Sequence, residues 1–92
     1  MHVEFKTKCG FKAKCVSAHM ALIDWFINLH PEKDIWYFSA DEPSFILQIE
    51  SAIERQFNHQ PSLDKSLSHE SQCKRLLLVL HEHGDISILN FA

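Results

Sequence analysis

His81 and His83 are the residues whose type and spacing most directly suggest chemistry. Neutral imidazole nitrogens bind divalent transition metals, and side chains two residues apart on a strand point to the same face of a sheet. A complete site needs a third ligand, and the chain offers Asp85, His69 and Cys73 as candidates. The sequence therefore predicts a metal site at His81 and His83 as one functional hypothesis.

His69 and Cys73 lie four residues apart, a spacing that brings two side chains to one face only where the chain is helical. The sequence contains no C-x-x-C pair and no H-E-x-x-H motif, the patterns that mark zinc sites most clearly. We therefore expect no cofactor under the main hypothesis developed below, and the metal site remains its alternative.

The sequence lacks the usual motifs of catalysis. It has no G-x-S-x-G motif, and its two glycines cannot form a glycine-rich loop around phosphates. Cys15 lies near Lys12 and Lys14, which could favour a thiolate, but it continues the apolar alternation of Phe11 and Ala13. We expect a buried, unreactive thiol at this position and a protein that is not an enzyme.

Length and composition indicate one α+β domain that spans residues 1–92. Hydrophobic residues make up 46% and charged residues 23% of the chain, as in ordinary globular proteins. No apolar run approaches the roughly 20 residues of a membrane span, and no secretory signal begins the sequence. Three cysteines without framework spacing fit a reducing compartment, so we expect a cytoplasmic protein without a membrane partner.

The charge is distributed unevenly along the chain. The formal net charge is −3, yet residues 1–16 carry four lysines and one glutamate. A duplex-binding domain is normally basic overall, so nucleic acid is not an expected partner. The lysines could steer an anionic partner or the acidic part of a second copy, or they could discourage pairing at a sheet edge.

The first third of the chain predicts two strands and a helix. Apolar and polar residues alternate from His2 to Lys8 and again over residues 11–15, which indicates half-buried strands. Cys9 and Gly10 between them predict a hairpin, with a bulge in one longer strand as the alternative. Ser17 can cap a helix that extends to Leu29 and stops before a proline.

The middle of the chain predicts a strand, a helix and a polar connection. Aromatic and β-branched residues over Asp34–Ala40 favour a strand. A capping box over residues 39–42 predicts a helix that reaches about Phe57. Residues 58–72 are polar, and we expect either a short helix or a mobile segment there.

Two further strands are expected near the C-terminus, over residues 74–81 and 85–91, joined by a turn at 82–84 into a hairpin. The predicted fold is therefore α+β, with a mostly antiparallel sheet of four or five strands and two principal helices in the order ββαβαββ. Strands that are apolar on both faces need cover on both faces. If both helices cover one face, an apolar sheet face stays bare. If they divide between the faces, none does.

The main functional hypothesis is built on that bare face. We predict a small interaction or regulatory module, without catalytic activity, that binds another protein or a second copy of itself as a homodimer. The alternative is a small-ligand or metal-binding domain that uses His81 and His83. The expected protein-binding residues of the sheet face are Trp36, Tyr37, Leu77 and Val79.

Overall fold

The computed structural model describes residues 2–29 and 41–91, which form a three-stranded antiparallel sheet and three helices in the order ββαααβ. None of the helices in these residues is both long and apolar enough to cross a membrane. The elements are β1 (Val3–Thr7), β2 (Lys12–Cys15), α1 (Ala18–Leu29), α2 (Glu42–Phe57), α3 (His69–Glu82) and β3 (Ile86–Phe91).

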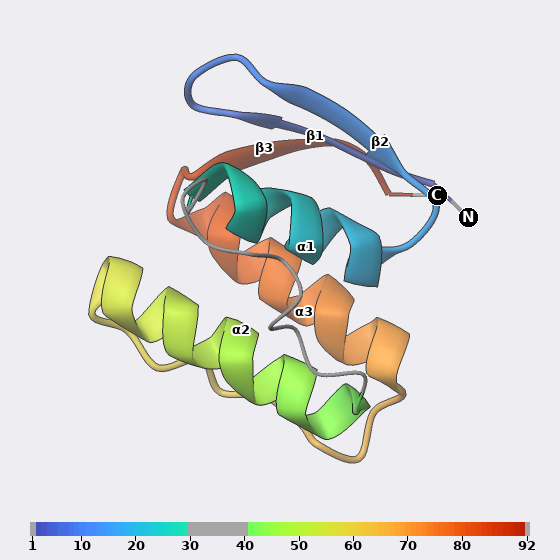
Figure 1. Ribbon diagram of the computed structural model, residues 1–92, viewed down its shortest axis with the longest axis vertical. Helices are drawn as coiled ribbons and strands as arrows, with labels where there is room; N and C mark the ends of the chain where they lie inside the picture. The colour runs from blue at the N-terminus through green and yellow to red at the C-terminus, as the bar shows by residue number, and fades with distance from the viewer. Residues whose placement is uncertain (1, 30–40, 92) are drawn as a thin grey trace.

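The elements are stacked in three layers (Figure 1). The sheet has the strand order β2-β1-β3, so the last strand of the chain pairs with the first. Helices α1 and α3 pack side by side against one face of the sheet, and α2 packs against them on the side away from the sheet. Helix α3 is therefore the central helix of the fold.

The N-terminal hairpin is confirmed. β1 and β2 pair antiparallel with Val3 opposite Cys15 and Lys6 opposite Lys12. Gly10 lies in the turn with φ of 92°, a left-handed conformation that glycine adopts without steric cost. The buried residues of the hairpin face the helices and its lysines face outward, as the alternation predicts.

The two predicted helices of the first sixty residues are also confirmed. Ser17 Oγ accepts the backbone N–H of Met20 at 3.1 Å, which caps α1 as expected. For α2 the capping residue is Asp41, whose carboxylate accepts the backbone N–H of Ser44 at 3.0 Å. The capping box predicted from residue 39 lies partly outside the described residues.

The strand predicted over residues 74–81 is wrong, because this segment belongs to α3. Four apolar residues of α3 are fully buried at the helical spacing i, i+3, i+4 and i+7, namely Cys73, Leu76, Leu77 and Leu80. Leucine favours a helix, and a short apolar run does not by itself distinguish a strand from a buried helix. Ser68 caps the start of the helix, which ends at Glu82 just before a glycine with φ of 74°.

The predicted fold order and strand number are therefore corrected. The segment over residues 82–84 ends a helix and does not turn a hairpin, and β3 pairs with β1. The connection predicted over 58–72 is shorter, because α3 already begins at His69. The strand predicted over Asp34–Ala40 lies outside the described residues.

The sheet face away from the helices is polar in the described strands. Outward-facing residues there are Glu4, Lys6, Lys12, Lys14 and Ser87, together with Leu89 at 53% exposure. The apolar face expected from a strand over residues 76–80 is absent from these strands, since that run is in the core of α3. Self-association itself stays a prediction.

Two adjacent leucines of α3 test whether residues 74–81 form a helix. Leu77 is fully buried, whereas Leu78 is 36% exposed. We expect Leu77→Ala to lower the free energy of unfolding by about 2–5 kcal/mol, through lost burial and a cavity. Leu78→Ala, the matched control, should cost less than about 1 kcal/mol. Urea denaturation followed by circular dichroism measures both, and equal losses would contradict the helical assignment.

Candidate metal site

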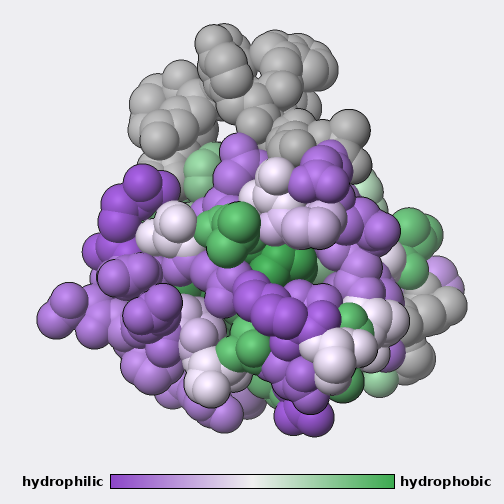
Figure 2. All heavy atoms as spheres, turned by 90° about the horizontal axis from the view of Figure 1, so that it is seen from below, coloured by the Kyte–Doolittle hydropathy of each residue, from purple (hydrophilic) through white to green (hydrophobic). Residues whose placement is uncertain are grey.

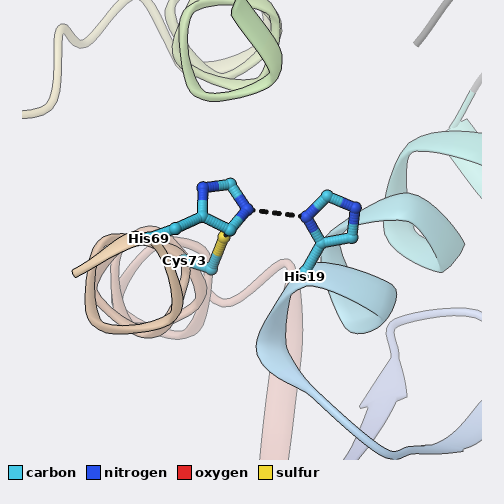
Figure 3. A group of neighbouring side chains, drawn as sticks. All are labelled: His19, His69 and Cys73. Atoms are coloured by element: carbon cyan, nitrogen blue, oxygen red, sulfur yellow. Dashed lines mark hydrogen bonds between the residues drawn. The ribbon is translucent and has the colours of Figure 1, made fainter. Parts of the chain in front are cut away.

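Three side chains with metal-binding atoms meet at the N-terminal ends of α1 and α3 (Figure 3). His19 comes from the first turn of α1, and His69 and Cys73 come from the first turns of α3. One atom of each, an imidazole nitrogen or the thiol sulfur, lies within 4.8 Å of the other two. It is the only group of three such ligands among the residues that the structure describes.

Helix α3 supplies two of the three ligands. His69 and Cys73 are four residues apart, and in a helix this spacing places two side chains one above the other on the same face. Cys73 Sγ lies 3.6 Å from His69 Nε2. From the sequence, His69 and Cys73 were expected to share a face only if the residues between them are helical, and in α3 they are.

A carboxylate of α3 holds the start of α1 in place. The backbone N–H of Ala18 donates to Glu70 Oε2 at 2.6 Å, and that of His19 donates to Glu70 Oε1 at 3.4 Å. The first N–H groups of a helix lack partners within it, and a negative charge there is favourable. Because Glu70 follows His69 directly, this contact also sets the distance between the two histidines.

The rings of His19 and His69 contact each other directly. His19 Nδ1 and His69 Nε2 are 2.7 Å apart, a hydrogen bond in which one ring donates and the other accepts. The ring of His19 also stacks on Phe45 of α2, with 4.1 Å between ring centroids. All three helices thus contribute to the walls of the site.

One of the distances within the group already fits a tetrahedral zinc site. Bonds of about 2.0 Å to nitrogen and about 2.3 Å to sulfur place neighbouring ligands roughly 3.3–3.6 Å apart. The separation of Cys73 Sγ from His69 Nε2, 3.6 Å, already fits. The 2.7 Å between the two histidines is too short, so the His19 ring must move away from His69 and toward Cys73 to admit an ion.

The ionisation states of the ligands suit metal binding, except that the Cys73 thiol must lose its proton. Burial, and then the nearby charge of His69, lowers the pKa of His19, which favours the neutral imidazole that a metal requires. Burial, with smaller effects of Glu70 and Glu42, raises the pKa of the Cys73 thiol to about 12. Cys73 must therefore release its proton when it binds an ion.

The same residues also suggest a nucleophilic cysteine. Cys73 lies beside His69, and the second nitrogen of His69, Nδ1, is 3.5 Å from Glu42 Oε2, which is the order nucleophile, base and carboxylate. Cys73 is fully buried, however, and its raised pKa leaves almost no thiolate at neutral pH. The arrangement therefore suits metal binding better than covalent catalysis.

The other two cysteines have separate environments. Cys15 is buried, as predicted, and its thiol donates to Asp24 Oδ2 at 3.1 Å. Burial and the Asp24 carboxylate raise its pKa to about 12, so this thiol is poorly reactive. Cys9 is exposed in the turn of the hairpin. Neither belongs to the three-ligand group.

The predicted pair His81 and His83 lies at the other end of α3. His83 is the C-cap residue that follows α3, and side chains two positions apart on a helix differ in direction by about 160°, so the shared face expected for a strand is lost. His81 Nδ1 accepts the backbone N–H of Ile88 at 3.3 Å, and His83 stacks on Phe57. Metal binding by this pair stays a prediction, without the geometry on which it was based.

The predicted protein-binding residues are divided among different environments. Trp36 and Tyr37 lie outside the described residues. Leu77 is fully buried in α3, and Val79 is partly buried against the core. The structure therefore does not bring Leu77 and Val79 together on a sheet surface.

His19 is the ligand that the sequence analysis missed. It stands fifty residues before His69, with no motif that connects the two. A helix assigned to residues 69–82 would have identified the pair His69 and Cys73, but only the packing of α1 against α3 adds His19.

No family model, curated protein or solved structure matches this chain. The geometry of the site is therefore the basis from which a function can be inferred.

Replacement of Glu70 tests the contact that holds the site together. We expect Glu70→Gln to lower the free energy of unfolding by about 1–3 kcal/mol, because a charge-assisted cap of α1 is weakened. Glu82→Gln, which removes an exposed carboxylate from the last turn of the same helix, is the control and should change stability by less than about 0.5 kcal/mol. Urea denaturation compares the two, and similar small effects would show that Glu70 does not link the helices.

Proposed function

We propose that this protein is a small metal-binding domain that holds a zinc-type ion between α1 and α3. The ligands would be His19 Nδ1, His69 Nε2 and Cys73 Sγ. The observation that supports this most strongly is the convergence of these three atoms within 4.8 Å, although one of them comes from a segment fifty residues away.

The donor atoms indicate the class of metal. Two imidazole nitrogens and one thiolate favour zinc or copper, whereas magnesium and calcium prefer oxygen ligands. Three protein ligands leave a fourth tetrahedral position for water or another exchangeable ligand. The proposed site is therefore one that can accept a further small ligand on the ion.

The ion would act as a second connection between α1 and α3, next to the Glu70 contact. The described core already holds seventeen buried hydrophobic residues, and no buried side-chain nitrogen or oxygen in these residues lacks a hydrogen-bond partner. The fold is thus complete without the ion. Metal binding would stabilise a structure that already exists, in proportion to the concentration and affinity of the ion.

The surface supports self-association less directly than the side-chain cluster supports metal binding. Figure 2 looks onto the side of the molecule where α2 lies, and hydrophobic areas there are small and separated by hydrophilic residues. In the described part of the chain, the exposed large hydrophobic residues are spread over helices, strands and connections: Phe11, Val16, Met20, Leu47, Leu78 and Leu89.

Zinc titration of the reduced protein tests the proposal. Isothermal calorimetry should show one zinc ion bound per chain. Cys73→Ala and His19→Ala should each weaken binding by more than about 100-fold, because a lost ligand costs more than a lost outer-shell partner, which costs about 10- to 100-fold. Circular dichroism of each variant checks that it folds.

The double variant His81→Ala/His83→Ala is the matched control, since it removes two imidazoles from the C-terminal end and the C-cap of the same helix. It should bind zinc with unchanged affinity. No binding by the parent protein, or loss of binding in the double variant alone, would contradict the proposed site.

A further inference from the structure

The two nitrogens of His69 face different chemical groups. Nε2 faces the candidate site, 2.7 Å from His19 Nδ1 and 3.6 Å from Cys73 Sγ. Nδ1, on the other edge of the ring, lies 3.5 Å from Glu42 Oε2. Glu42 belongs to the first turn of α2, and its side chain is 65% exposed, so the carboxylate can rotate the remaining half ångström or so to a hydrogen bond.

The chemistry of imidazole then decides which nitrogen carries the proton. A neutral histidine has one N–H donor and one acceptor nitrogen, and an ionised carboxylate can only accept. A carboxylate at Nδ1 therefore retains the proton there and leaves Nε2 as the acceptor. It follows that in the hydrogen bond between the rings, His19 Nδ1–H is the donor and His69 Nε2 the acceptor.

We propose that Glu42 fixes the direction of the His19–His69 hydrogen bond and so presents His69 Nε2 as the unprotonated nitrogen at which the ion first binds. Glu42 is in this view a positioning residue, which acts on the metal through His69. The part that concerns the ion rests on the proposed function, whereas the direction of the hydrogen bond does not.

A surface hollow, lined also by Lys65, brings His69 into contact with solvent. This hollow of about 480 Å³ lies beside α2 and is lined by Glu42, Leu47 and His69, among others. Of the three ligands, only His69 lines this hollow, while Cys73 is fully buried. An ion that enters here would meet the Glu42 carboxylate and the ring of His69 before it reaches the thiol.

Binding of the ion requires one proton to leave the protein. His69 needs no change, because its Nε2 is already free of a proton. The proton on His19 Nδ1 moves to Nε2 through solvent, so that Nδ1 can bind the ion. Cys73 loses its thiol proton to solvent as the metal–sulfur bond forms, and one proton is released for each ion that binds.

The tautomers can be measured without any metal. Long-range ¹H–¹⁵N correlation spectra of the metal-free protein at about pH 8, where an ordinary histidine is neutral, should show protonated Nδ1 in both His19 and His69. In Glu42→Ala, His69 should lose this preference. Glu54→Ala is the control, since it removes an exposed carboxylate from the same helix, and it should leave both tautomers unchanged.

The zinc affinity of the same variants provides the second measurement. Glu42→Ala should bind zinc about 10- to 100-fold more weakly than the parent protein, the usual effect of losing an outer-shell carboxylate, and Glu54→Ala should not. A protonated Nε2 on His69 in the parent protein, or equal effects of the two variants, would overturn the inference. If the parent protein binds no zinc, the proposed function fails, and the metal-free spectra alone decide the role of Glu42.

Discussion

One carboxylate determines how the two central helices of this protein meet. Glu70, in the first turn of α3, accepts the first backbone N–H groups of α1, whose own residues cannot satisfy them. The contact joins residues 52 positions apart in the chain and places a negative charge at the positive end of a helix. Because His69 precedes Glu70 and His19 carries one of the capped amides, the same contact brings two imidazoles together.

The candidate site follows from this contact and from the position of α3 at the centre of the fold. One face of α3 buries leucines against the sheet and the other helices, and its N-terminal end presents His69 and Cys73 toward α1. Phe45 of α2 then stacks on His19, and Glu42 of α2 lies beside His69 Nδ1. Packing and polar contacts therefore place the ligands before any ion is bound.

The sequence predicted the elements whose local pattern is unambiguous. Alternation over the first fifteen residues and the Ser17 cap of α1 were sufficient for the hairpin and the first helix. Residues 76–80 were misassigned because five consecutive apolar residues fit both a strand and a buried helix. That one error made most of α3 the first strand of a predicted hairpin and increased the number of strands. It also placed His81 and His83 on a shared face. His19 could not be predicted by any local rule, since only tertiary packing brings it to His69.

We propose that the nitrogen atoms of His19 and His69 and the sulfur of Cys73 bind one ion together. X-ray absorption spectroscopy of the zinc-loaded protein tests it directly, because sulfur and nitrogen neighbours give different bond lengths. We expect one sulfur at about 2.3 Å from zinc and nitrogen or oxygen ligands at about 2.0–2.1 Å, two of them imidazoles. A zinc environment of nitrogen and oxygen alone, without the Cys73 sulfur, would contradict it.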